Sequence, residues 1–110
     1  MIDWKRVCEL RAEVGEADFA EVVDLFTEEV ETLIHRLRTQ PDPALLREDL
    51  HFLKGCAVNL GFSALAELCF AGEILAASGA PEQVDLTAVL DCYQKSRAAF
   101  LNGLLKGSAA

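Results

Sequence analysis

Apolar residues that recur every three or four positions constrain the fold of this chain more than any other feature of its sequence. The clearest run has apolar positions at Phe19, Val22, Val23, Phe26, Val30, Leu33, Ile34 and Leu37. This spacing places the side chains on one face of an α-helix, whereas a β-strand would alternate at every second residue. The sequence therefore predicts an all-α fold.

Similar patterns and helix-breaking residues divide the rest of the chain. The predicted helices run from Asp3 to Val14, from Asp18 (or just after Gly15) to Thr39, from Pro43 to Leu60, from Ser63 to Ala77 and from Leu86 to Leu104. Short connections force consecutive helices to be antiparallel neighbours. We therefore expect an antiparallel up-down-up-down four-helix bundle with a short extra N-terminal helix. We also expect it to form one stand-alone domain over residues 1–110, with residues 107–110 frayed.

Capping residues indicate where several helices begin. Asp18 and Glu21 have the spacing of a capping box. Asp42 would cap the third helix, with Pro43 in its first turn. Ser63 would cap the fourth.

The predicted core combines one face from each helix. On the third helix Leu46, Leu50, Leu53, Ala57 and Leu60 form a seam. The inward positions of the first helix are Trp4, Val7, Cys8, Leu10 and Val14, and those of the fourth are Leu65, Leu68, Cys69, Gly72, Leu75 and Ala76. The four cysteines form no CxxC pair, so we expect them to fill the core rather than form disulfides or a zinc site.

Charge and hydropathy exclude some functions. The formal net charge is −8, which argues against non-specific binding to nucleic acid. The longest stretch without a charge, residues 55–66, is shorter than the roughly 20 residues that span a bilayer. The N-terminus has no apolar run of the signal-peptide type, so we expect a cytoplasmic protein.

One histidine lies where a core residue is not expected. His51 follows the seam residue Leu50 and is rotated by about 100° around the helix from it, so it should border solvent. Lys54 and Gly55 lie one turn further on. Together they offer a nucleophile, a charge that stabilises anions, and a clearance for an incoming molecule. The alternatives are a solvated histidine, an ordinary surface lysine and a glycine that permits tight helix packing.

This segment resembles the histidine-containing phosphotransfer (HPt) domain family. The family pattern is His-x-Leu-Lys-Gly, several small residues, Leu-Gly and then a leucine-rich helix. This chain has His51-Phe52-Leu53-Lys54-Gly55, then Asn59-Leu60-Gly61 and Leu65-Ala66-Glu67-Leu68-Cys69. The match is dense over about 25 residues, and the helix count agrees along the whole chain.

The resemblance implies a role in a multistep two-component phosphorelay. His51 would accept a phosphoryl group, through the ring nitrogen remote from the backbone, from a receiver-domain aspartate and pass it to another. Lys54 would hold the phosphoryl oxygens, and Gly55 would admit the receiver. The implied partners are response-regulator receiver domains, with a hybrid histidine kinase as a further candidate. We expect a monomer.

Residues beside His51 on the same helix are candidates for partner binding. They are Arg47, Glu48, Phe52 and Val58. If the bundle follows the family, the second helix and the N-terminal helix should border the same patch.

The chain is expected to be a phosphocarrier, not an enzyme. It has neither a GxxxxGK[ST] loop nor a kinase-type glycine-rich motif, so it should have no ATP site of its own. Glu48 and Asp49 offer too few oxygens for a Mg²⁺ site. We therefore expect no cofactor or metal on this chain, and Mg²⁺ on the partner receiver domain.

Two other functions remain open. The first is a degenerate helical adaptor that binds receiver or kinase domains without carrying phosphate. The second is a small metal-binding bundle that uses His35, His51 and the cysteines, although no HxxH or ExxH pair supports it. Without that site, we expect His35 to be solvated.

Two positions depart from the family pattern. Gly72 occupies an inward position where the family usually has a larger apolar residue. Phe70 occupies a position where the family more often has a polar residue. Either Phe70 folds over the gap left by Gly72, or it belongs to a surface for self-association or for a partner.

Overall fold

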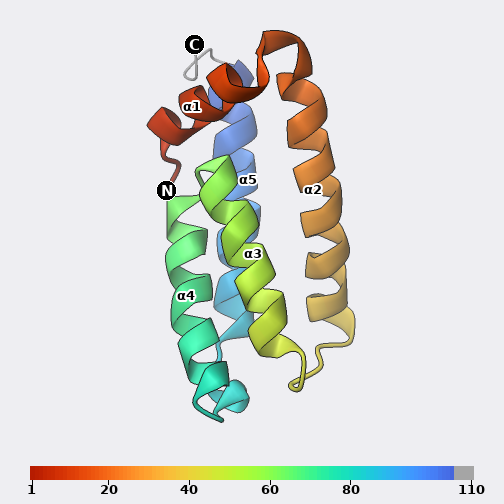
Figure 1. The fold of residues 1–110 in the computed structure, drawn as a ribbon. Coiled ribbons are helices and arrows are strands. Elements are labelled where there is room, and N and C mark those ends of the chain that lie inside the picture. The colour runs from red at the N-terminus through yellow and green to blue at the C-terminus, as the bar shows by residue number, and fades with distance from the viewer. Residues whose placement is uncertain (106–110) are drawn as a thin grey trace.

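The computed structural model describes residues 1–105, and its regular elements there are helices (Figure 1). They are α1 (Trp4–Val14), α2 (Glu16–Thr39), α3 (Leu46–Leu60), α4 (Ser63–Ala77), the 3₁₀ helix η1 (Pro81–Gln83) and α5 (Leu86–Leu105). The prediction of an all-α fold is confirmed. The expected fraying of residues 107–110 lies outside the described residues.

The four long helices run alternately down and up, and α1 crosses one end of them (Figure 1). The α3 helix lies between α2 and α4 in this view, with α5 behind it, and packs most extensively against α4. The described part measures 42 × 21 × 20 Å. The predicted four-helix bundle with an extra N-terminal helix is therefore confirmed.

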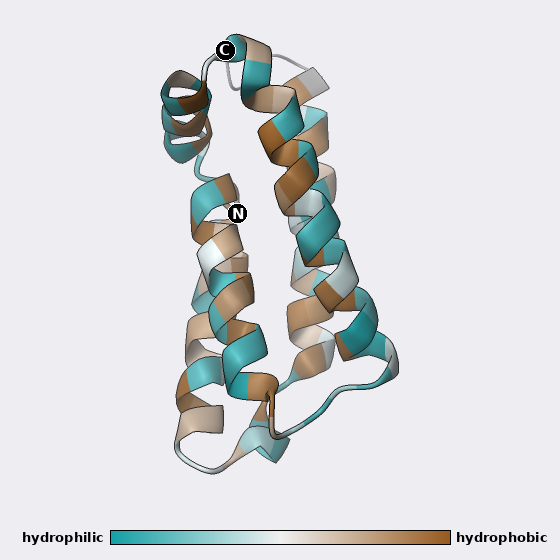
Figure 2. Ribbon diagram, turned by 45° about the vertical axis from the view of Figure 1, so that its right-hand side comes forward, coloured by the Kyte–Doolittle hydropathy of each residue, from teal (hydrophilic) through white to brown (hydrophobic). Residues whose placement is uncertain are grey.

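The core consists mainly of the apolar faces that the periodicity predicts. Each long helix carries both hydrophobic and hydrophilic residues (Figure 2). Every residue of the predicted α3 seam is buried, and Leu50 and Leu53 have no exposed surface. Burying one leucine side chain contributes about 1.5–3 kcal/mol, so this seam alone is a large part of what holds α3 in place.

Two helices begin at positions other than those predicted from capping residues. The α2 helix begins at Glu16, directly after Gly15 (φ 87°), which confirms the alternative start considered for it; Asp18 therefore lies within the first turn and is not a cap. The α3 helix begins at Leu46, because Asp42 accepts a hydrogen bond from the backbone N–H of Ala44 (2.9 Å) and so stabilises a separate turn. Side-chain hydrogen bonds of this kind compete with helix formation.

The turn between α3 and α4 binds the N-terminal segment. The backbone N–H of Asp3 donates to the carbonyl of Gly61 (2.7 Å), which has a φ of 79°. A Cβ at position 61 would lie 2.7 Å from the carbonyl oxygen of Asp3, so only glycine fits here. Ser63 does not cap α4 as predicted, since its hydroxyl donates to the carbonyl of Met1 (3.0 Å) and Phe62 occupies the N-cap position.

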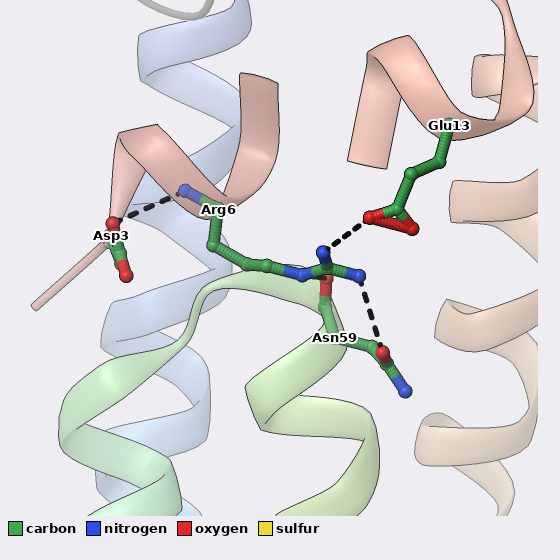
Figure 3. Close-up of polar contacts among 4 residues, drawn as sticks. All are labelled: Asp3, Arg6, Glu13 and Asn59. Carbon is green, nitrogen blue, oxygen red and sulfur yellow. Dashed lines mark hydrogen bonds and ion pairs between the residues drawn. The ribbon is translucent and has the colours of Figure 1, made fainter. Parts of the chain in front are cut away.

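Polar contacts hold α1 against the end of α3 (Figure 3). Arg6 donates to the backbone carbonyl and to the side-chain oxygen of Asn59, each at 3.3 Å, and pairs with Glu13 at 2.7 Å. Asp3 caps α1, as predicted, by accepting from the backbone N–H of Arg6 (3.2 Å). The guanidinium thus joins α1 to the helix that carries His51.

Some predicted core positions are not buried. Cys8 and Leu68 are exposed, so their placement in the core was wrong. Trp4 is half-buried and stacks on Phe100 of α5, with 6.0 Å between the ring centroids. Cys56 and Cys69 are buried among apolar residues, as predicted, and Cys92 is half-buried.

No helix within residues 1–105 combines the length and the hydrophobicity that a membrane span needs.

Candidate functional site

His51 lies on the solvent-facing side of α3, next in sequence to the fully buried Leu50. Its side chain is 68% exposed, which confirms the prediction that this position borders solvent. Because the buried seam of α3 fixes the helix in the bundle, the exposed ring stands on a rigid support.

A carboxylate from the neighbouring helix holds one nitrogen of this ring. Oε1 of Glu73, on α4, lies 2.8 Å from Nδ1 of His51. An ionised carboxylate can only accept a hydrogen bond, so Nδ1 carries the proton. In the neutral ring Nε2 then has the free lone pair, and this is the nitrogen remote from the backbone.

The same carboxylate binds Lys54. Nζ of Lys54 donates to the second oxygen, Oε2, of Glu73 at 2.8 Å. The hydrogen bond from Lys54 is the main cause that lowers the pKa of Glu73; burial opposes it, and the hydrogen bond from His51 adds a smaller lowering. Glu73 is therefore ionised at neutral pH, as the assignment of the proton to Nδ1 requires.

Gly55 faces open space. Apart from the adjoining backbone of α3 itself, a Cβ built at this position would have no heavy atom of the described residues within 4 Å. Tight helix packing, the structural explanation considered for this glycine, is therefore excluded. A methyl group at position 55 would therefore point into open space beside His51 and Lys54 on α3.

His51 and Phe52 line two shallow hollows on the surface. The first is formed with Ala44, Arg47, Glu48 and Glu73, and the second with Phe26, Glu29, Gly55, Cys56 and Asn59. The second hollow includes residues of α2, and α1 reaches its edge through the Arg6–Asn59 contact. Both helices thus border the patch, as expected.

The four predicted partner-binding residues are all exposed but do not form one cluster. Arg47, Glu48 and Phe52 lie beside His51. Val58 is also exposed, but it lines a different hollow, between α1, α3 and the start of α4. The structure therefore separates Val58 from the other three.

The gap at Gly72 is filled by residues other than Phe70. A Cβ on Gly72 would lie 2.8 Å from Cδ1 of Leu50 and 3.2 Å from Cγ1 of Val84. Phe70 points outward and is 54% exposed. The interpretation that Phe70 folds over the gap is therefore wrong.

Glu73, which contacts both His51 and Lys54, was not among the residues predicted from the sequence. The α4 segment contains only two charged residues, Glu67 and Glu73, in an otherwise apolar and small-residue helix. The isolation of this acid in an otherwise apolar stretch is the signal that the sequence offers, but its contact with α3 depends on how the two helices pack.

The residues considered for a metal site do not come together. His35 is exposed on α2, as predicted for a solvated residue. No three His, Cys, Asp or Glu side chains in the described part of the chain are placed to hold a metal ion.

Comparison with known families places most of the chain in one family. The family model described as "Hpt domain" matches residues 21–99, which contain His51, Lys54, Gly55 and Glu73 but exclude α1. No significant match was found to a curated protein or to a solved structure. Hpt domains are phosphocarrier modules with a phosphotransfer-related role in two-component signalling, and residues 21–99 are well over half of this chain. The chain therefore belongs to the Hpt domain family.

Proposed function

We propose that this protein is an intermediate carrier in a multistep phosphorelay. His51 accepts a phosphoryl group from the aspartate of one receiver domain and passes it to the aspartate of another. The observation that carries the proposal is the paired state of the ring, with Nδ1 held by Glu73 (2.8 Å) and Nε2 left available on an exposed side chain.

The chemistry follows from this proton arrangement. The lone pair of Nε2 attacks the phosphorus of the aspartyl phosphate, the N–P bond forms, and the bond to the carboxylate oxygen breaks, so that the aspartate leaves as a carboxylate. The ring keeps its proton on Nδ1 and becomes positively charged. Glu73 lies beside this charge and stabilises it.

The same proton favours onward transfer. When a second aspartate attacks the phosphorus, the N–P bond breaks and the imidazole leaves with Nδ1 still protonated. A ring that had lost this proton would leave as an anion, which is a much poorer leaving group. Glu73 therefore supports transfer in both directions by keeping Nδ1–H in place.

Lys54 is placed to neutralise the phosphoryl oxygens. Its ammonium has three N–H donors, of which the contact with Glu73 uses one. The others can bind oxygens of a phosphoryl group on His51, which precedes Lys54 by one helical turn. Phosphoryl transfer depends on such charge neutralisation and on in-line geometry.

The partner supplies the rest of the reaction centre. We propose that receiver domains, or a hybrid histidine kinase that carries one, dock over His51 and Phe52 and bring the Mg²⁺ ion with them. Gly55 leaves room for their loops, since its Cβ position is open. This division requires no ATP or metal site on the present chain.

Incubation with a phosphorylated receiver domain tests the proposal. The protein should acquire acid-labile phosphate, and His51→Gln should acquire none. His35→Gln is the matched control, because it removes the other, also exposed, histidine, and it should be labelled like the wild type. Equal labelling of His51→Gln would contradict the proposal. Receiver binding without any phosphate on the wild-type protein would instead support a non-phosphorylated adaptor.

A further inference from the structure

Phe70 is an exposed aromatic residue that the core does not explain. Leu50 and Val84 occupy the space beside Gly72, and the ring of Phe70 is 54% exposed on α4. The ring of Phe70 therefore neither fills the core nor covers Gly72, and its role must lie in its contacts on the surface of α4.

The ring of Phe70 lies next to the ammonium group of Lys54. Nζ of Lys54 is 5.2 Å from the centre of the ring, within the range of a cation–π interaction. Glu73 follows Phe70 by three residues, so the two side chains lie one turn apart on α4. The α4 helix thus offers one ammonium both a carboxylate and an aromatic face.

The carboxylate alone is a poor means of holding Lys54 during the reaction. Glu73 is shared between Lys54 and His51. A phosphoryl group on His51 binds the remaining N–H donors of the same ammonium, so Glu73 alone does not set its position. The lysine side chain is also flexible and loses rotamer freedom when it is held in place. The aromatic face attracts the ammonium without taking any of its hydrogen-bond donors.

We propose that Phe70 is a positioning residue for Lys54: its ring keeps the ammonium beside His51, so that the charge is in place when the phosphoryl group arrives. The proposal rests on the proposed function of His51 and Lys54. It assigns Phe70 no contact with the phosphoryl group itself.

A small phosphodonor separates this role from partner docking. Phosphoramidate transfers its phosphoryl group to Nε2 of His51: the N–P bond of the reagent breaks, the new N–P bond forms, and ammonia leaves. No receiver domain takes part, so a residue that acts only in docking has no effect on this rate.

We expect Phe70→Leu to slow labelling by phosphoramidate about two- to fivefold, the range that a cation–π contact at an exposed site supports. Phe70→Tyr and Phe70→Trp keep an aromatic face and should preserve the rate. Ile74→Ala is the matched control, because Ile74 lies one turn further along α4, is 53% exposed and has no aromatic face to offer the ammonium. In a Lys54→Gln background, Phe70→Leu should have no further effect.

The contact also has a spectroscopic signature. The ring current of Phe70 should shift the ε-methylene protons of Lys54 upfield in the NMR spectrum, and Phe70→Leu should remove this shift. Ile74→Ala should leave it unchanged. This measurement needs no phosphorylation, so it tests the contact even if His51 proves not to accept phosphate.

Three results would overturn the proposal. They are a Phe70→Leu protein that is labelled at the wild-type rate while Lys54→Gln is slow, an equal loss in Ile74→Ala, and an absent ring-current shift. A defect of Phe70→Leu that is seen only with a receiver domain would likewise replace it with a docking role. Failure of the proposed function looks different: the wild-type protein would then carry no phosphate on His51 from either donor.

Discussion

Replacing Gly55 by alanine should stabilise the folded protein and, at the same time, slow its phosphotransfer with receiver domains. A glycine inside a helix costs about 1 kcal/mol relative to alanine. Beyond the adjoining backbone of its own helix, the new Cβ meets no atom of the described residues within 4 Å, so no clash offsets this gain. The free energy of unfolding should therefore rise by about 0.5–1 kcal/mol, and a change of 1 kcal/mol moves the melting temperature of a domain near this size by about 4–8 °C.

Phosphotransfer from a receiver domain should become slower in the same variant, because the added methyl group projects into the space that the receiver must enter. A Gly55→Gln variant, with a longer side chain, should be slower still. Urea unfolding measures the first effect, and the rate of label transfer from a phosphorylated receiver measures the second. Labelling by phosphoramidate is the internal control and should not change.

Ala98→Gly provides the matched comparison, since Ala98 is exposed in the middle of α5. It should lower the free energy of unfolding by about 0.5–1 kcal/mol and leave transfer unaffected. A Gly55→Ala protein that is less stable than the wild type, or that receives phosphate from receivers at the full rate, would refute the reasoning about clearance.

Three further outcomes are expected. Asp49→Ala removes the acceptor of two short hydrogen bonds from Arg36 (2.8 and 2.6 Å) that join α2 to α3. It should lower the free energy of unfolding in urea by about 1–2 kcal/mol, moderated because the arginine is 40% exposed. Lys54 and, to a lesser extent, His51 lower the pKa of Glu73 below its ordinary value of 4.5, so the contribution of these contacts to stability should be complete above about pH 4.5. It should fall as the pH drops through the lower folded-state pKa, and Glu73→Gln should flatten this part of the stability–pH curve. Burial raises the pKa of the Cys69 thiol to about 12, so iodoacetamide should alkylate the exposed Cys8 and spare Cys69 in the native protein, as mass spectrometry would show.

The helices and their buried faces could be predicted because burial follows periodicity. The seam of α3 and the stripe of α2 are examples, since their leucines, valines and isoleucine are buried or half-buried as expected. Helix starts were harder to predict, because a side chain that can cap a helix can also bind elsewhere. Asp42 stabilises a turn before α3, and Ser63 binds the carbonyl of Met1.

Only the residues of the site that lie on α3 could be predicted from the sequence. His51, Lys54 and Gly55 belong to α3, so their spacing places them on one surface. Glu73 and Phe70 come from α4, and their contacts with α3 depend on the rotation and register of two packed helices. Local periodicity does not contain that information, which is why the group that sets the proton on His51 was missed.

Determining which ring nitrogen of His51 carries the phosphate tests the central claim most directly. Two-dimensional ¹H–¹⁵N NMR of His51, before and after phosphorylation by a receiver domain, reports both the protonated and the phosphorylated nitrogen. The structure predicts a proton on Nδ1 in both states, held by Glu73 at 2.8 Å, and phosphorus on Nε2 alone. Phosphorus on Nδ1, or a ring that stays unmodified while another residue is labelled, would contradict the account.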